Sequence, residues 1–141
     1  MRRLKRFAAL PPGERRLLLR SFIWISAVRI ALWVLPLRVI RAIILRCSNC
    51  SRSDSVNEVV WAVRTSSRYV LGASCLTQAL AAQVLLAGSN HQSRIEIGVA
   101  KEQELFAAHA WLVCEERIVL GGPDVARYVP LASWEVKKNP L

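Results

Sequence analysis

Acidic residues are scarce in this sequence, and they are unevenly placed. Ten Asp+Glu stand against twenty Lys+Arg in 141 residues, and Glu14 is the only acid before residue 53. Twelve basic side chains minus that one acid give residues 1–52 a charge of +11, whereas residues 53–141, with eight basic and nine acidic side chains, carry −1. The chain therefore joins a basic, apolar N-terminal third to a near-neutral remainder, and its net charge of +10 suggests an anionic partner.

Long uncharged apolar runs are also missing. Between residues 21 and 45, three arginines and Pro36 interrupt the apolar sequence and leave two uncharged runs of eight residues. Crossing a bilayer as a helix takes about 20 apolar residues, so we expect no simple transmembrane span.

The sequence also lacks a secretory signal. The basic opening, residues 1–7, is followed by Pro11, Pro12 and Glu14, where a signal peptide would have its apolar core. Because no such signal follows and the four cysteines are unevenly spaced, we expect them to be free thiols of a cytoplasmic protein. The hydrophobic content of 53% excludes a disordered tail and supports a domain with a real core.

Periodicity predicts helices followed by strands. Helices are expected at residues 14–35, 37–47, 56–70 and 75–88, and strands at 94–99, 107–114 and 117–120, with a tight turn at 115–116. This order predicts an α+β fold. We place a basic, apolar helical region at residues 1–55 and a compact core at residues 56–141.

The first long helix is apolar on nearly every side. Trp24, Ile30 and Trp33 lie outside the stripe that helical spacing assigns to a core-facing surface. Such a helix must be covered by the protein itself, by a partner or by a membrane surface, and the sequence leaves these choices open.

Cys75 and His109 form the strongest candidate site. Ser74 is a suitable N-cap, so Cys75 falls in the first turn of a helix, where the dipole and free N–H groups stabilise a thiolate. His109 lies 34 residues later on a strand of the predicted hairpin, where it is able to act as a general base. A cysteine at a helix start with a histidine on a hairpin is the skeleton of a thiol hydrolase.

Three segments carry a family resemblance. Residues 73–86 (ASCLTQALAAQVLL), 94–99 (RIEIGV) and 106–113 (FAAHAWLV) are similar to the transglutaminase-like cysteine proteases of lasso-peptide biosynthesis, and to their stand-alone leader peptidases in particular. The resemblance covers about residues 56–132. It implies a papain-related core that cuts the leader from a ribosomally made precursor. It also implies a separate leader-recognition protein as helper, and a separate ATP-dependent cyclase that closes the ring.

The resemblance assigns Cys75 as the nucleophile and His109 as the base. Family members place an acid on the strand after the histidine hairpin, and residues 118–122 contain none, so Asp124, the nearest downstream carboxylate, is the expected third member. If Asp124 does not reach His109, a backbone carbonyl or a polar side chain orients the ring, and the site is a dyad. The expected oxyanion donor is the Cys75 N–H. We expect no cofactor and no metal.

Other interpretations stay open. Cys47 and Cys50 have the CxxC spacing of half a zinc site or a redox pair, without a second pair of ligands. The same Cys–His site would also support acyl transfer. A non-catalytic protein that docks its basic N-terminus on a membrane surface or an anionic partner is the alternative from another class. Nucleic acid is not expected, because no recognised module interleaves exposed aromatics with the arginines.

Overall fold

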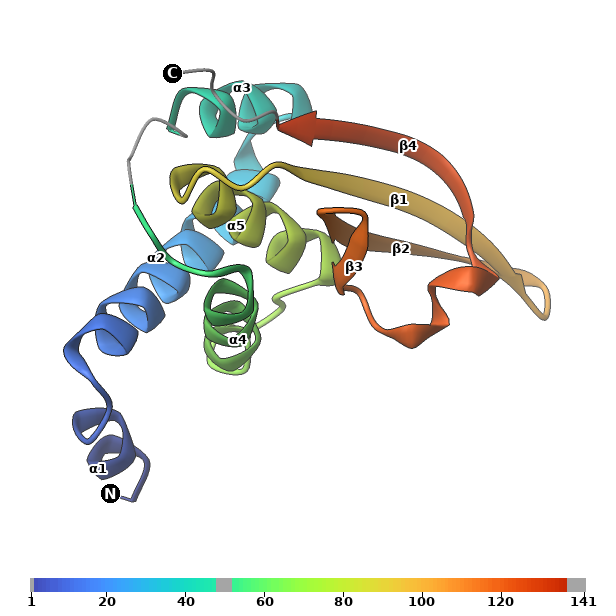
Figure 1. The fold of residues 1–141 in the computed structure, drawn as a ribbon. Coiled ribbons are helices and arrows are strands. Elements are labelled where there is room, and N and C mark those ends of the chain that lie inside the picture. The colour runs from blue at the N-terminus through green and yellow to red at the C-terminus, as the bar shows by residue number, and fades with distance from the viewer. Residues whose placement is uncertain (1, 48–51, 137–141) are drawn as a thin grey trace.

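The structure, a computed structural model, describes residues 2–47 and 52–136, without the Cys47 side chain. Its elements are α1 (Arg2–Ala8), α2 (Pro12–Val34), α3 (Leu37–Cys47), α4 (Val56–Ser67), α5 (Cys75–Gly88), β1 (Ser93–Glu102), β2 (Leu105–Cys114), β3 (Arg117–Leu120), the 3-10 helix η1 (Pro123–Arg127) and β4 (Val129–Val136). The α+β prediction is confirmed, and each predicted element is present (Figure 1). The sequence patterns missed α1, η1 and β4.

Local signals account for most helix boundaries. Pro12 occupies the first turn of α2, where its missing N–H costs nothing, and Leu35 is extended before Pro36. Helix α4 opens with a capping box in which Ser55 and Glu58 bond each other's backbone N–H. It ends earlier than predicted, at Ser67, whose hydroxyl bonds the Arg64 carbonyl and competes with the helix hydrogen bonds.

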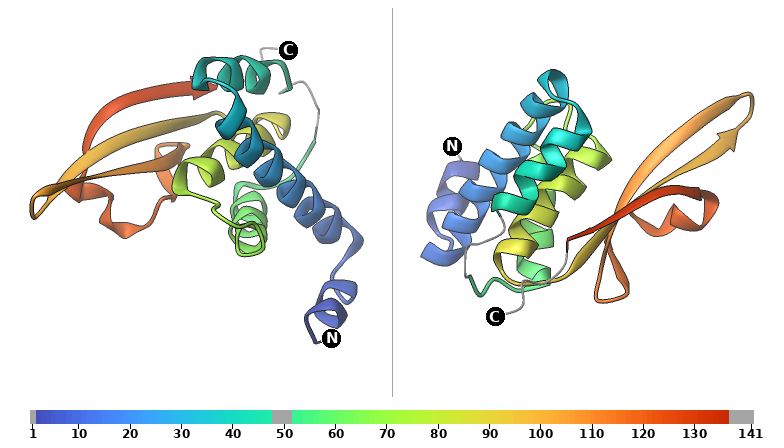
Figure 2. Two further views of the ribbon diagram at one scale, coloured as in Figure 1. Left: turned by 180° about the vertical axis from the view of Figure 1, so that it is seen from behind. Right: turned by 90° about the horizontal axis from the view of Figure 1, so that it is seen from above.

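The strands form one antiparallel sheet in the order β3-β2-β1-β4. Strands β1 and β2 pair along their whole length, from Ser93 with Cys114 to Glu102 with Leu105, so both are longer than predicted. The edge strand β4 contains Pro130 and pairs with β1 with a register shift. Because of these two irregularities, its sequence does not alternate regularly between apolar and polar residues, and the strand was not predicted. The β1–β2 hairpin extends well away from the helices (Figure 2).

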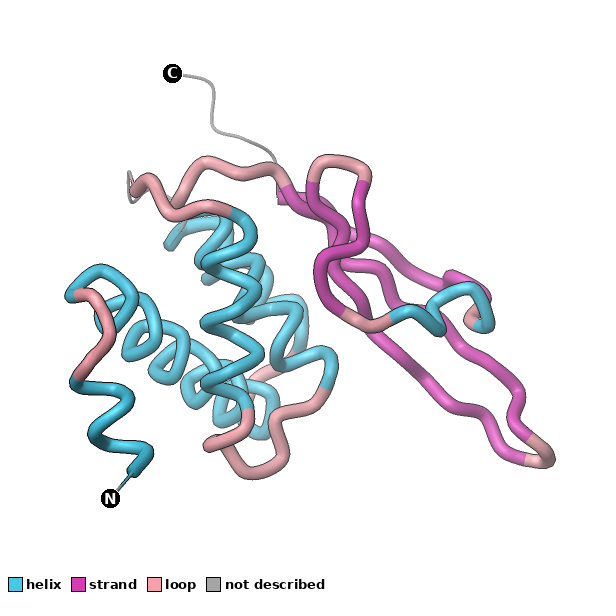
Figure 3. The backbone as a smooth tube through the Cα atoms, turned by 60° about the horizontal axis from the view of Figure 1, so that its bottom comes forward, coloured by secondary structure: helices cyan, strands magenta, loops and turns pink. Residues whose placement is uncertain are grey.

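The α-helices lie together on one side of the sheet, and η1 lies beside the strands away from them (Figure 3). A single apolar cluster joins Ile25 of α2, Val59 of α4 and Leu80 of α5 to Ile95 and Leu112 on the sheet. This core contains residues from both sides of position 55, so the N-terminal helices share it with α4, α5 and the sheet. The boundary that we placed there stays a prediction.

Helix α2 is long and apolar enough, by length and composition alone, to cross a membrane. Its most apolar 18-residue window has a mean hydropathy of 1.7, and 28% of that window is buried inside the protein. Core helices of soluble proteins satisfy the same criterion. Its contacts with α4 and α5 show that one side belongs to the core.

Candidate active site

Cys75 is the first residue of α5. Ser74 caps the helix as predicted, with its hydroxyl accepting from Thr77 N at 3.3 Å and its carbonyl from Gln78 N at 3.0 Å. In the described part of the chain, the N–H groups of Cys75 and Leu76 have no acceptor. They are the uncompensated donors that every α-helix has at its start, and they lie beside the thiol.

The chain around His109 reaches the thiol directly. The backbone N–H of Ala110 on β2 donates to Cys75 Sγ at 3.4 Å, across 35 residues of sequence. Because Ala110 follows His109 in the chain, this bond brings the Cys75 sulfur to the backbone next to His109. Both side chains are half-buried.

The His109 ring is held by a backbone carbonyl. Its Nε2 lies 2.6 Å from the carbonyl oxygen of Gly121, at the end of β3. A carbonyl only accepts, so Nε2 carries the proton and Nδ1 is left as the basic nitrogen. Tyr128 lies against the ring, with a centroid distance of 5.1 Å, and restricts its rotation. The tautomer and orientation of the His109 ring are therefore fixed without a carboxylate.

Gly121 occupies a position that other residues do not fit. Its φ is +119°, and a Cβ built there would lie 2.3 Å from the Cβ of Trp111. The next residue, Gly122, has a φ of +81° with open space around the corresponding point. Sequence reasoning did not assign Gly121 to the site, although a Gly-Gly pair directly after a strand indicates unusual backbone.

Trp111 is a buried residue next to His109 and Gly121. Only 2% exposed, it packs with Val113, Val125 and Tyr128 in a small second core. Its indole N–H donates to Glu96 at 2.7 Å. Trp111 is thus a core residue that also fixes the backbone beside His109. Glu96 was not predicted as part of this arrangement, although strand alternation places it opposite Trp111 on the neighbouring strand.

Asp124 does not join this cluster. It lies in η1 and is exposed, and within residues 52–136 no hydrogen bond connects its carboxylate to the His109 ring. Pro123 starts η1 and carries the chain away from the strand direction. The assignment of Asp124 as the third member stays a prediction. The sequence left Asp124, a backbone carbonyl or a polar side chain as the group that orients His109. In the structure, the backbone carbonyl of Gly121 bonds the His109 ring.

Cys114 and the turn carboxylates are not part of the Cys75 site. Glu115 and Glu116 form the predicted turn with positive φ and exposed side chains. Cys114 is buried, and burial raises the pKa of its thiol. The CxxC interpretation involves the Cys47 side chain and Cys50, which lie outside the described residues. Among the side chains that are described, no group of His, Cys, Asp and Glu is arranged to hold a metal ion.

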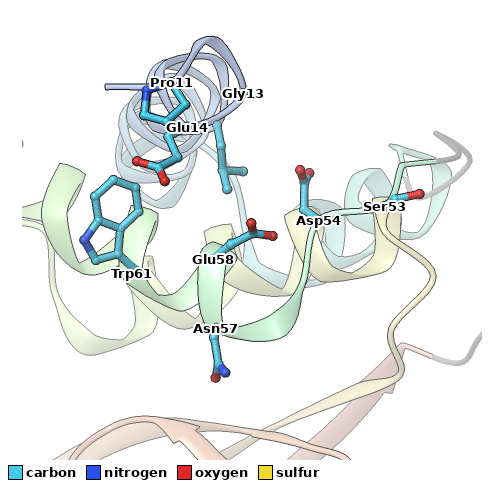
Figure 4. A pocket seen from close by; sticks show the side chains of 9 residues that line it. Pro11, Gly13, Glu14, Ser53, Asp54, Asn57, Glu58 and Trp61 are labelled. Carbon is cyan, nitrogen blue, oxygen red and sulfur yellow. The ribbon is translucent and has the colours of Figure 1, made fainter. Parts of the chain in front are cut away.

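A groove of about 680 Å³ lies elsewhere, between the start of α2 and α4 (Figure 4). Glu14, Asp54 and Glu58 line it together with Trp61. Asp54 pairs with Arg20 at 3.3 Å, and Glu58 serves the helix cap. Asp54 thus joins the segment before α4 to α2, Glu58 stabilises the start of α4, and the groove does not include Cys75.

The chain belongs to the transglutaminase-like superfamily, whose family model matches residues 22–133. That superfamily is generally one of cysteine-dependent acyltransferases and proteases. The matched range includes α3 and most of α2 as well as the Cys75 and His109 elements. No curated protein and no solved structure matches the chain significantly.

Proposed function

We propose that this protein is a cysteine endopeptidase that removes the leader from a ribosomally made lasso-peptide precursor. The observation that supports the catalytic part is the hydrogen bond from Ala110 N to Cys75 Sγ, which brings a helix-start thiol to the backbone next to His109, whose ring bonds the Gly121 carbonyl. The superfamily supports cysteine chemistry. The choice of a lasso precursor is supported by the sequence resemblance of residues 73–86 and 106–113.

The proposed reaction follows from these atoms. His109 Nδ1 takes the proton of Cys75, and the thiolate attacks the scissile carbonyl to form a C–S bond. The free N–H groups of Cys75 and Leu76 bind the resulting oxyanion. As the C–N bond breaks, His109 returns the proton to the leaving amine, which is the new N-terminus of the core peptide. His109 then deprotonates a water molecule that hydrolyses the thioester.

The orienting role falls to Gly121 in this proposal. The His109 Nε2–H donates to the Gly121 carbonyl throughout, and a neutral acceptor holds the tautomer while giving the imidazolium less support than a carboxylate would. Replacing Asp124 by alanine should therefore leave kcat unchanged. A large loss of kcat in that variant, without loss of folding, would restore Asp124 as the third member.

The proposed partners follow from the same resemblance. We propose a separate leader-recognition protein as helper, as the similarity of residues 73–86 and 106–113 to stand-alone leader peptidases implies. A lasso cyclase is the expected next enzyme, since cleavage frees the amine that ring closure needs. We place these reactions in the cytoplasm, where precursors are made.

The test uses mass spectrometry. The full chain is incubated with the precursor and the leader-recognition protein encoded near it, alongside Cys75→Ala and His109→Ala variants. One new cut at the leader–core junction, absent in both variants, is expected. Cys47→Ala and Cys50→Ala are the matched controls and should cut normally. Cleavage that persists in Cys75→Ala would remove the assigned nucleophile. A product linked to an added amine, in place of a hydrolysed one, would show acyl transfer.

A further inference from the structure

Helix α2 has two apolar faces, and the protein covers one of them. Leu17, Leu18, Ile25 and Val28 point into the core, where Ile25 is fully buried. The opposite face consists of exposed residues at helical spacing: Leu19, Phe22, Ile23, Ala27, Ile30, Trp33 and Val34. We call these seven residues the outer stripe. An ordinary surface helix would present polar side chains there.

The outer stripe is long and carries no charge. From Leu19 to Val34 it runs about 22 Å along the helix axis, at about 1.5 Å for each residue. Of the two arginines within this span, Arg20 pairs with Asp54, and the guanidinium of Arg29 lies over the ring of Trp33 at one end of the stripe. Trp33 is 81% exposed. Contiguous exposed apolar surface of this kind marks an interaction site.

Cations stand at both ends of the outer stripe. Arg16 precedes it on α2, Arg38 follows it on α3, and both are exposed. In the described part of the chain, neither forms an ion pair. Helix α1 adds four further exposed basic side chains, at positions 2, 3, 5 and 6, and has no acid. An uncharged stripe between cations, with a tryptophan near one end, matches the acyl region and headgroups of an anionic bilayer.

We propose that the outer stripe docks the protein on an anionic lipid surface, with α2 lying in the plane of the interface. A transmembrane orientation does not fit, because α4 and α5 cover the other face of α2. Figures 1 and 2 show the β1–β2 hairpin extending away from α2. The docked protein would therefore keep the sheet in the aqueous phase. This proposal is independent of the peptidase function.

The test is co-sedimentation of the full chain with phosphatidylcholine vesicles, with and without phosphatidylglycerol. Binding is expected only to the anionic vesicles, and added salt should weaken it. Replacing Ile23 and Ile30 by glutamate should reduce the partition coefficient by at least about tenfold for each residue. Arg16→Gln and Arg38→Gln should each reduce it roughly fivefold.

The matched control replaces Leu105 and Phe106, which are as exposed as the stripe but lie at the hairpin tip. The double glutamate variant there should bind vesicles like the wild type. Circular dichroism melts check that each variant is folded. A second readout is fluorescence quenching by brominated acyl chains, which the Trp33→Phe variant should largely lose.

Three results would overturn the proposal. The first is an absence of binding to anionic vesicles by the folded wild type. The second is equal binding by the variant with glutamate at positions 23 and 30. The third is a dimer that forms without lipid and dissociates on those same substitutions, which would assign the outer stripe to a second copy of the chain.

Discussion

Replacing Gly121 by alanine should damage both stability and catalysis, whereas the same change at Gly122 should affect stability alone. Each substitution puts a Cβ on a residue with positive φ, at φ values of +119° and +81°. Such strain costs about 1–3 kcal/mol. At Gly121 the new Cβ would also lie 2.3 Å from Trp111 Cβ. Carbon atoms in contact are about 3.5–4.0 Å apart, so the backbone or Trp111 must move by more than about 1 Å.

That movement adds an overpacking cost of about 1–3 kcal/mol, so Gly121→Ala should lose about 2–6 kcal/mol in total. Gly122→Ala has open space around its Cβ and should show the backbone term alone. Displacing residue 121 also moves the carbonyl that holds His109 Nε2 at 2.6 Å. A misplacement of about 1 Å at a catalytic group lowers kcat by about a hundredfold.

The assays are urea unfolding for stability and precursor cleavage for kcat, with rates corrected for the folded fraction. We expect a near-normal kcat for Gly122→Ala and a loss of about a hundredfold for Gly121→Ala. Equal unfolding free energies for the two variants would refute the contact with Trp111. A normal kcat in folded Gly121→Ala would refute the orienting role of the carbonyl.

Four further predictions concern thiols, capping and packing. Because burial raises the pKa of Cys114, iodoacetamide at mildly alkaline pH should modify Cys75 and spare Cys114 in the folded protein, as peptide mapping would show. The folded state holds the Cys114 proton more tightly than the unfolded chain, so stability should fall as pH rises above 9.0, and Cys114→Ala should reduce that fall in thermal melts. Ser55→Ala removes the capping box and should cost about 1 kcal/mol in urea unfolding. Ile25→Ala should cost about 2–5 kcal/mol and Ile30→Ala less than about 0.5 kcal/mol, and similar values for the two would contradict the assigned faces of α2.

Local sequence signals determined much of this fold. The Ser74 cap, the apolar spacing of residues 75–88 and the turn at residues 115–116 each depend on neighbours within a few positions. They were sufficient to place Cys75 at a helix start and His109 on a strand. The same signals were insufficient for β4, because its pairing partner β1 is remote in sequence and a register shift interrupts the alternation.

Tertiary packing decided what those local signals left open. The bonds from Ala110 N to Cys75 Sγ and from His109 Nε2 to Gly121 O join residues 35 and 12 positions apart, so no local spacing encodes them. Asp124 was chosen from the sequence as the nearest carboxylate, but nearness along the chain does not set direction in space. Helix α2 gives the same lesson, because helical spacing predicted a core-facing stripe but left open what covers the other apolar residues, and the packing of α4 and α5 on one side leaves them exposed. The sequence by itself determined the helix-start thiol and the strand histidine, and the tertiary structure decided which groups meet them and which apolar face stays exposed.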